Sequence, residues 1–180
     1  MNDRLIQKLK KIKLIISDVD GVLTDGSIYI GSNGEEMKKF SVEDGAGVAL
    51  ARASGLIIAL LSGRFSSATD IRAKELKIED IYNGMLNKIP AYEELKRKYN
   101  LEDSEIVYIG DGLIDIPVME KAGIPVSVKN AHPTAKETAV YVTDKSGGSG
   151  ALQETIELVL KAQNQYDDAI NKMREKVLNL

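Results

Sequence analysis

The sequence predicts an α/β fold, in which helices cover both faces of a parallel β-sheet. Short apolar segments alternate with segments of helical periodicity along most of the chain, as expected for parallel strands joined by helical crossovers. The apolar segments lack the polar alternation of a strand with one wet face, so each should be covered on both faces. We expect strands at residues 14–17, 56–61, 81–82, 106–109, 125–128 and 140–142, and helices at residues 45–54, 66–76, 90–99, 114–122 and 151–160.

Residues 27–40 are expected to form a β-hairpin. Asn33-Gly34 is a strong hairpin turn signal. The two arms carry four apolar side chains, Ile28, Ile30, Met37 and Phe40. The segment between the first two strands holds only this hairpin and one helix, which is too little for a lid domain that would exclude water from a site.

The C-terminal tail, residues 164–180, has a different composition from the rest of the chain. It is polar and charged, with a narrow apolar stripe at helical spacing formed by Tyr166, Ile170, Met173 and Val177. The tail is expected to be either a solvated or frayed terminal helix or an oligomer contact.

Length and composition exclude several classes of protein. The 180 residues suit one domain spanning residues 1–180, and a net charge of −3 with no Trp argues against a nucleic-acid partner. The absence of Cys excludes disulfides, thiolate nucleophiles and Cys-ligated zinc, and a single histidine, His132, argues against a histidine metal cage. No segment approaches the roughly 20 apolar residues of a membrane span. We therefore expect a cytoplasmic protein that binds no membrane.

Two acidic residues follow the first strand. Asp18 and Asp20 are two residues apart, and Gly21 allows the backbone to turn tightly after them. Carboxylates this close repel each other, and a shared proton or a hard cation such as Mg²⁺ relieves the repulsion. The carboxyl ends of strands are also where ligands bind in an open α/β sheet. The alternative is an ordinary loop with solvated acids.

A serine ends the next strand. Ser62 is followed by Gly63 and Arg64, so its hydroxyl could donate to a phosphate oxygen while Gly63 lets backbone amides approach. The alternative for Ser62 is the N-cap of the following helix.

Two more strand ends carry charged residues. Asp111 could reach a cation held by Asp18, and Asp115, four residues on, could hold water ligands of that cation. Lys88 could bring an ammonium group to a transferring phosphoryl group. The alternatives are a helix cap for Asp111, an exposed Asp115 and a structural Lys88.

These residues occur at successive strand ends in the order Asp, Ser, Lys, Asp, and here the chain resembles a known superfamily. The haloacid dehalogenase (HAD) superfamily of phosphohydrolases has four motifs that match D-V-D-G-V-L-T-D (18–25), L-S-G-R (61–64), Lys88 and G-D-G-L-I-D (110–115). More narrowly, the chain is similar to the bacterial 3-deoxy-D-manno-octulosonate 8-phosphate (KDO 8-P) phosphatases, which have counterparts of the hairpin, V-E-D-G-A-G (42–47), N-A-H-P (130–133) and G-G-S-G-A (147–151). The resemblance spans residue 12 to about residue 163. It implies a Rossmann-like three-layer α/β/α sheet of the HAD type with a hairpin insert and no cap domain.

The resemblance also implies roles for the residues. Asp18 would be the nucleophile that forms an aspartyl-phosphate, and Asp20 the general acid and base. Mg²⁺ would be held by Asp18, the main-chain carbonyl of Asp20 and Asp111, with Asp115 orienting the metal waters. Substrate would be bound by Ser62, Gly63, Arg64, Arg72 and Lys88.

Two positions depart from the family pattern. Gly112 stands where the family usually has a second acid, and Gln153 stands where the family often has arginine. The first departure predicts weaker metal binding, and the second removes one expected contact to the substrate.

The implied function is Mg²⁺-dependent hydrolysis of KDO 8-P to the free sugar acid and phosphate, in lipopolysaccharide precursor biosynthesis. Arg64 and Arg72 are eight residues apart, and we expect them to share one helix face and to bind the carboxylate of the sugar acid. The implied assembly is a homotetramer whose hairpins pack together and whose neighbouring subunits cover the site.

Three alternatives remain open from the sequence. The first is a phosphatase for an N-acylneuraminate 9-phosphate or another sugar phosphate. The second is a phospho-accepting, receiver-like signalling domain. The third is a catalytically silent assembly subunit, which the glycine at position 112 motivates.

Overall fold

A six-stranded parallel sheet runs through the molecule. The computed structural model describes residues 3–178, without the side chain of Val177. All neighbouring strands of this sheet are parallel. Their order is β5 (Asp80–Asn83), β4 (Ile57–Ser62), β1 (Leu14–Ser17), β6 (Ile106–Gly110), β7 (Ile124–Ser127) and β8 (Tyr141–Val142). All four residues of β1 are buried, so this interior strand is covered on both faces as its apolar sequence predicts.

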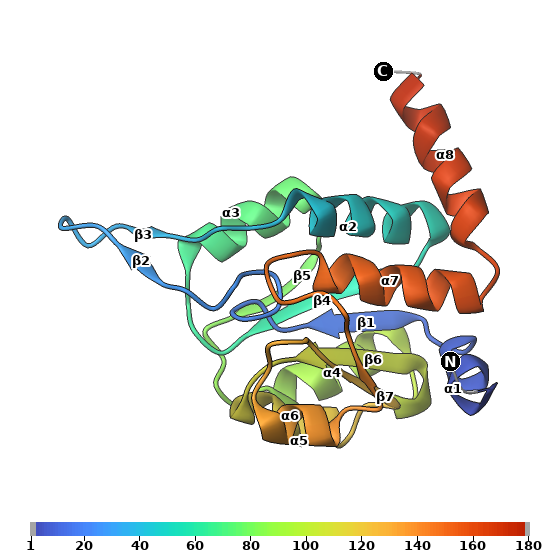
Figure 1. Cartoon of the computed structure of the whole chain (residues 1–180), viewed down its shortest axis with the longest axis horizontal. Coiled ribbons are helices and arrows are strands. Elements are labelled where there is room, and N and C mark those ends of the chain that lie inside the picture. Colours follow the sequence, from blue (N-terminus) through green and yellow to red (C-terminus); the bar gives the residue numbers. More distant parts are fainter. Residues whose placement is uncertain (1–2, 179–180) are drawn as a thin grey trace.

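Helices form a layer on each face of the sheet (Figure 1). One layer contains α2 (Val42–Ser54), α3 (Ser67–Leu76) and α7 (Ala151–Ala162), and the other contains α4 (Ile89–Tyr99), α5 (Ile116–Met119) and α6 (Pro133–Thr138). This arrangement confirms the predicted three-layer α/β/α fold. Within residues 3–178, no helix is long and apolar enough to cross a membrane.

The hairpin projects from the body of the molecule (Figure 1). It consists of β2 (Tyr29–Ile30) and β3 (Glu36–Met37), which pair antiparallel with Tyr29 opposite Met37. From Glu36 to Phe40 the side chains alternate, and Glu36, Lys38 and Phe40 are the partly buried ones. One face of this arm therefore turns toward the body, as the period of two of an extended chain requires. The predicted hairpin is confirmed.

Asp44 connects two helices of one layer. Its side chain is buried on α2, and its Oδ1 accepts a hydrogen bond of 3.0 Å from the backbone N–H of Gln153 at the start of α7. Burial raises the pKa of Asp44 to about 6, although backbone donors at the start of α7 oppose this rise. The pair α2 and α7 is thus joined by a carboxylate that is costly to ionise.

Two local predictions differ from the structure, and two helices were not predicted. Residues 114–122 form no continuous helix, because a 3₁₀ turn at Leu113–Asp115 precedes the short α5. The helix expected from residue 45 begins at Val42, because the Ser41 side chain caps it by accepting from the Glu43 amide. Helices α1 (Asp3–Leu9) and α6 were not expected from the sequence.

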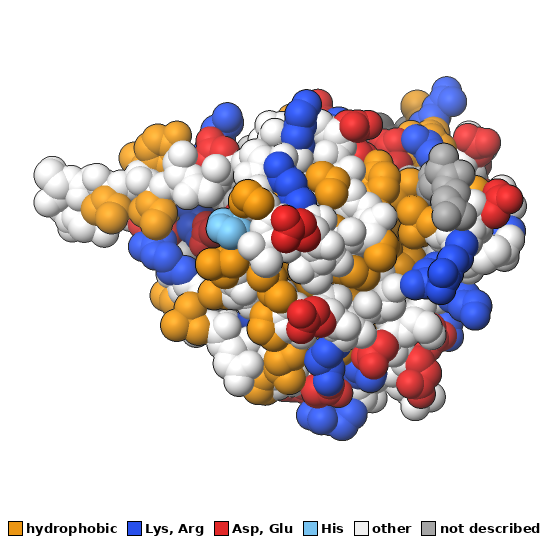
Figure 2. Space-filling model, turned by 60° about the horizontal axis from the view of Figure 1, so that its bottom comes forward, with side chains coloured by type: hydrophobic (Ala, Val, Ile, Leu, Met, Phe, Trp, Pro, Cys, Tyr) orange, Lys and Arg blue, Asp and Glu red, His pale blue; other side chains and the backbone are white. Residues whose placement is uncertain are grey.

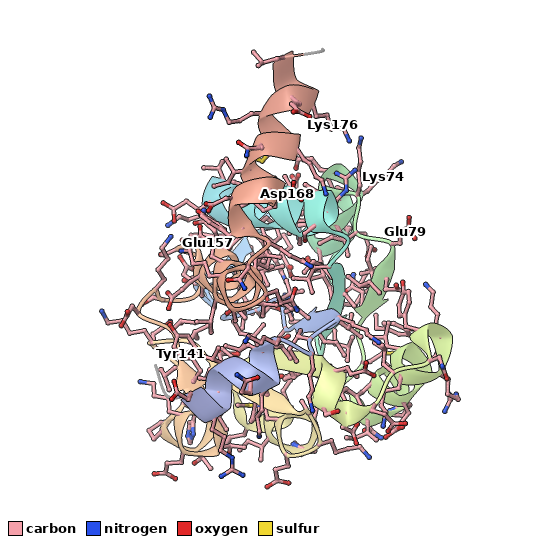
Figure 3. All side chains as sticks on the ribbon, turned by 90° about the vertical axis from the view of Figure 1, so that its right-hand side faces the viewer. Lys74, Glu79, Tyr141, Glu157, Asp168 and Lys176 are labelled. Carbon is pink, nitrogen blue, oxygen red and sulfur yellow. The ribbon has the colours of Figure 1, made fainter. Side chains whose placement is uncertain are left out.

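The tail forms α8 (Tyr166–Leu178), which rises beyond the body (Figures 1 and 3). Tyr166, Ile170 and Met173 pack partly buried against the core, and Ala169 is fully buried. The helix contacts α2 of the same chain. The side chain of Val177, the last member of the predicted apolar stripe, lies outside the described residues. The charged Asp168 and Lys176 belong to this helix (Figure 3).

Candidate active site

Three acidic side chains meet where β1 and β6 end. Asp18 directly follows β1, and Asp111 directly follows β6, which pairs with β1. Asp115 lies at the end of the 3₁₀ turn. Each of the three offers a carboxylate oxygen, and these oxygens all lie within 4.8 Å of one another. The adjacency of two parallel strands therefore assembles the cluster that the sequence analysis expected.

Lys88 is buried among these acids at the start of α4. Its Nζ lies 2.8 Å from Asp18 Oδ1 and 2.7 Å from Asp115 Oδ1, and it donates over 3.1 Å to the hydroxyl of Tyr108. Tyr108, on β6, donates in turn to Asp115 Oδ1 at 2.6 Å. The structure therefore places Lys88 against the predicted nucleophile and buries it, rather than leaving it exposed in a loop.

All the acceptor positions of Asp115 are used within the protein. Lys88 and Tyr108 occupy Oδ1, and the backbone amides of Asp111 and Gly112 each donate to Oδ2 over 3.0 Å. A carboxylate has about four lone-pair sites, so Asp115 is saturated. The geometry supports an anchoring role for Asp115 more directly than the predicted role of orienting metal waters.

The cluster carries more negative than positive charge. Burial, followed by the charge of Asp115, raises the pKa of Asp18 to about 8, and Lys88 only partly opposes this. Burial and Asp115 likewise raise the pKa of Asp111 to about 6. Burial lowers the pKa of Lys88, but Asp18 and Asp115 outweigh it and the pKa is raised, so Lys88 stays protonated. Carboxylate oxygens with excess negative charge are the donor set that Mg²⁺ prefers, so Asp18 and Asp111, beside the saturated Asp115, fit a magnesium ion.

Gly21 leaves room for Asp111. Its φ is +90°, and a Cβ atom at this position would lie 2.1 Å from Asp111 Oδ2. The loop that contains Gly21 is itself covered by Gly147, where a Cβ would lie 1.7 Å from the carbonyl oxygen of Gly21. The glycine-rich segment at residues 147–150 thus packs directly on the loop that follows β1.

Asp20 lies at the more open side of the cluster. Its side chain is 26% exposed, whereas that of Asp18 is 5% exposed. Lys38, from the hairpin arm, places its Nζ 2.6 Å from Asp20 Oδ1. Sequence analysis missed both Lys38 and Tyr108 as site residues.

The Ser62-Gly63-Arg64 turn borders the same site. Ser62 is buried and its hydroxyl donates to the carbonyl of Arg64 over 2.8 Å, while Ser66 holds the N-cap position of α3. The alternative of Ser62 as helix cap is therefore wrong. A Cβ on Gly63 would lie 2.7 Å from Ile114 and 3.9 Å from Lys88, which puts the turn beside the cluster.

The two predicted carboxylate-binding arginines do not share a helix face. Arg64 precedes α3 and pairs with Glu36 of β3. Arg72 lies on α3, where it pairs with Glu75 at 2.8 Å and donates to the Ser41 carbonyl at 3.1 Å. The structure therefore brings Arg64 to the rim of the site and places Arg72 against the end of the hairpin.

The structure also shows the surroundings of Gly112 and Gln153, the two positions that depart from the family pattern. A side chain at position 112 would have room, because a Cβ there would meet only Asp115 Oδ2, at an ordinary contact distance of 3.8 Å. Gln153 accepts a 2.9 Å hydrogen bond from Lys145, beside the Lys145–Glu43 ion pair. The glutamine side chain is thus engaged by Lys145.

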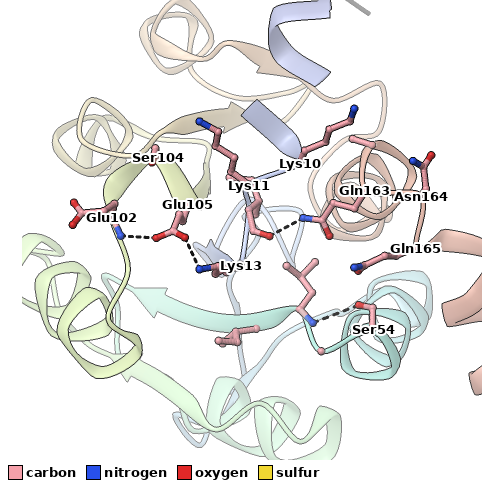
Figure 4. A pocket seen from close by; sticks show the side chains of 15 residues that line it. Lys10, Lys11, Lys13, Ser54, Glu102, Ser104, Glu105, Gln163, Asn164 and Gln165 are labelled. Atoms are coloured by element: carbon pink, nitrogen blue, oxygen red, sulfur yellow. Dashed lines mark hydrogen bonds and ion pairs between the residues drawn. The ribbon is translucent and has the colours of Figure 1, made fainter. Parts of the chain in front are cut away.

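A cavity of about 1050 Å³ lies at the opposite end of β1 (Figure 4). Residues that precede β1 form part of its lining. Among the lining residues, Lys13 pairs with Glu105 at 2.6 Å, and Gln163 donates to the Ile12 carbonyl at 2.7 Å. The lysine heads of Lys10 and Lys11 point away from its interior (Figure 4). We place the candidate active site at the acid cluster, because the carboxylates and the lysine that could act on a phosphate group are there. The cavity at the opposite end of β1 has no such cluster among the described residues that line it.

Comparisons with known proteins agree with this geometry. A family model described as haloacid dehalogenase-like hydrolase matches residues 56–154. The chain is 44% identical over 165 residues to the 3-deoxy-D-manno-octulosonate 8-phosphate phosphatase KdsC of Escherichia coli K12, covering 92% of this chain and 88% of that protein.

Solved structures are equally similar. The KDO 8-P phosphatase from Moraxella catarrhalis, in complex with a magnesium ion, a phosphate ion and a KDO molecule, has a TM-score of 0.91 and 43% identity, over 95% of this chain and 98% of that chain. The enzyme from Yersinia pestis has a TM-score of 0.91 and 41% identity, over 93% and 90%. The chain therefore belongs to the haloacid dehalogenase-like hydrolases, in the family of the 3-deoxy-D-manno-octulosonate 8-phosphate phosphatases.

Proposed function

We propose that this protein hydrolyses KDO 8-P to the free sugar acid and phosphate, with Mg²⁺ as its cofactor, as a step in the synthesis of lipopolysaccharide precursors. The observation that carries the proposal is Asp18, a buried carboxylate held by Lys88 within an acid cluster that fits magnesium. The relatives at more than 40% identity support the choice of substrate. Membership of this family also argues against a receiver-like signalling domain.

Asp18 is the nucleophile in this proposal. Lys88 and the backbone N–H of Val19 hold its Oδ1, at 2.8 and 2.7 Å, and among residues 3–178 no hydrogen bond to Oδ2 is found. Oδ2 is thus the oxygen that attacks phosphorus in line, and the product of the attack is an aspartyl-phosphate. Lys88 stays between Asp18 and Asp115 and offsets negative charge as the phosphate approaches.

Asp20 exchanges the proton. As the bond between phosphorus and the sugar oxygen breaks, Asp20 protonates that oxygen, and it then takes a proton from the water that hydrolyses the aspartyl-phosphate. Ser62 binds a non-bridging oxygen once its hydroxyl turns away from the Arg64 carbonyl, Lys88 attracts these oxygens through its charge, and Gly63 lets the backbone approach them. Asp18, the Asp20 carbonyl and Asp111 would hold Mg²⁺, which supplies charge neutralisation between two anionic reactants.

The test is phosphate release from a panel of sugar phosphates. KDO 8-P, N-acetylneuraminate 9-phosphate and simple hexose phosphates are compared with Mg²⁺ and with EDTA, and Asp18→Asn serves as the inactive control. We expect a strong, EDTA-sensitive preference for KDO 8-P. Preference for the nine-carbon acid would transfer the assignment to that substrate, and no turnover with any substrate would support a silent assembly subunit.

We further propose that the protein works as a homotetramer in the cytoplasm. Hydrophobic side chains gather on the hairpin and on the adjoining part of the body (Figure 2). Ile28, Tyr29, Ile30 and Met37 of the hairpin are 47–67% exposed, which favours burial against other subunits. Sedimentation velocity at working concentration tests the assembly, and a fully active monomer would rule it out. The cytoplasmic location rests on the sequence.

A further inference from the structure

We propose that Lys38 is a positioning residue for Asp20: it holds one oxygen of the Asp20 carboxylate so that the other faces the oxygen that leaves with the sugar. This inference rests on the proposed function and assigns a task to a residue outside the four family motifs. Lys38 itself does not touch the substrate in this proposal.

The contact between the two side chains is short and sheltered. Lys38 Nζ lies 2.6 Å from Asp20 Oδ1, with the Thr69 hydroxyl at 3.5 Å and Glu36 Oε1 at 3.9 Å. The Lys38 side chain has no exposed surface, whereas the Asp20 side chain is 26% exposed. The ammonium group therefore stands behind an accessible carboxylate, where it can fix the carboxylate without blocking it.

The direction of the hairpin arm explains how Lys38 reaches this position. Glu36 and Lys38 are two residues apart on an extended segment, so both point to the same face. Glu36 pairs with Arg64, and Lys38 pairs with Asp20 beside it. The outward residues between and after them, Met37 and Lys39, are 59% exposed and 67% exposed at the side chain respectively.

The burial of the Lys38 side chain indicates that its charge has a specific partner. A fully buried lysine is rare without a partner, because the charge loses its hydration. Here the nearest acceptor is the predicted general acid rather than a residue that only supports the hairpin. A lysine that merely anchored the hairpin arm would leave proton transfer from Asp20 unaffected. A substrate whose leaving group needs a proton and one whose leaving group does not can therefore distinguish a positioning role from an anchoring role.

Lys38 must support the proton transfer from Asp20 to the leaving oxygen. Asp18 forms a bond to phosphorus, the bond from phosphorus to the sugar oxygen breaks, and its electron pair stays on that oxygen, which takes the proton of Asp20. An alkoxide leaves poorly without this proton, whereas p-nitrophenolate leaves readily without it. A misplaced Asp20 therefore slows the first reaction far more than the second.

The experiment measures the first-turnover rate of phosphoryl transfer by rapid quench, with KDO 8-P and with p-nitrophenyl phosphate. Lys38→Met keeps the length of the side chain and removes its charge, and Lys39→Met is the matched control on the outward face. We expect Lys38→Met to lose on the order of 100-fold with KDO 8-P, the scale of general acid catalysis, and less than about threefold with the aryl phosphate. KM should change little, Lys38→Arg should recover part of the rate, and Lys39→Met should match the parent.

A double-mutant cycle tests the route of the effect. If Lys38 acts through Asp20, Lys38→Met should have no further effect on the KDO 8-P rate in an Asp20→Asn background. Equal losses with both substrates, or additive losses in the cycle, would overturn the inference while leaving the phosphatase intact. A parent protein inactive on both substrates would refute the proposed function itself. Circular dichroism and sedimentation check each variant, and if Lys38→Met does not fold, the Lys38→Arg leaving-group comparison decides the question.

Discussion

Asp44→Asn should change how stability depends on pH. Asp44 is 1% exposed, and its carboxyl has a pKa of about 6 in the folded chain against an ordinary value of 3.8. Between these two pH values the folded state binds more protons than the unfolded state, so the free energy of unfolding falls as pH rises through this window. A difference of about 2.2 pH units corresponds to about 3 kcal/mol, which the ionised Asp44 costs at neutral pH.

The assay is urea unfolding of the parent and of Asp44→Asn at several pH values from 4 to 7.5. The asparagine also alters the hydrogen bond to Gln153, but this effect does not depend on pH and cancels in the comparison. We expect the stability of the variant relative to the parent to rise by about 2.4 kcal/mol from pH 4 to pH 7.5, because an ordinary carboxyl is already more than half ionised at pH 4. Glu43→Gln, on the same turn of α2 but with a 52% exposed side chain, is the control and should show no such rise. A difference that stays flat across the window would refute the assignment of a strained carboxylate at this junction.

Three further predictions concern the site. Asp18→Asn should abolish turnover and leave the circular dichroism spectrum unchanged, because it replaces the nucleophile by a near-isostere; turnover near the parent rate would show that another group attacks phosphorus. Gly21→Ala should weaken Mg²⁺ binding by calorimetry and lower turnover, since its Cβ would lie 2.1 Å from Asp111 Oδ2 at a φ of +90°, and unchanged affinity would contradict this close approach. Tyr108→Phe should lower the free energy of unfolding by about 1–3 kcal/mol in urea, because it removes a donor to Asp115 and an acceptor for Lys88 deep in the core; a neutral effect would mean that these groups find other partners.

The sheet and the acids at its edge could be predicted from the sequence because each depends on local pattern. Uninterrupted apolar runs give buried strands, and Asp18 and Asp111 come directly after two of them. The carboxyl ends of parallel strands lie at the same edge of the sheet, so these residues come together there regardless of the conformation of the loops. The same reasoning predicted that Ser62 and Lys88 lie near these acids, and in the structure Lys88 contacts Asp18 while Gly63, next to Ser62, lies beside Lys88.

Other features depend on contacts that no local pattern reveals. The 3₁₀ turn before α5 closes because the Asp115 side chain accepts the amides of Asp111 and Gly112, which shortens the helix expected there. The helical spacing assumed for Arg64 and Arg72 fails because α3 begins at Ser67, after Arg64.

Lys38 and Tyr108 escaped notice for related reasons. A lysine on a hairpin arm is normally exposed, and its burial here follows from the way the arm lies over Asp20, 18 residues earlier in the chain. Tyr108 is the one polar side chain within a buried strand, I-V-Y-I-G, and this was a usable signal, because a buried tyrosine hydroxyl usually has a partner.

The packing of Gly147 on the Gly21 carbonyl has a consequence for synthesis of the chain on the ribosome. The loop that carries Asp18 and Asp20 is made first, but the segment that seals it is about 125 residues further along the chain. β1 must also wait for its second neighbour, β6, so a nascent chain exposes an unpaired strand edge and an uncovered loop at residues 18–21 for most of its translation. At about 5–20 residues per second, this interval lasts roughly 6–25 seconds. A larger side chain at position 147 should therefore lower the yield of folded protein first. Any defect in the catalytic activity of the finished enzyme would be measurable only after that loss.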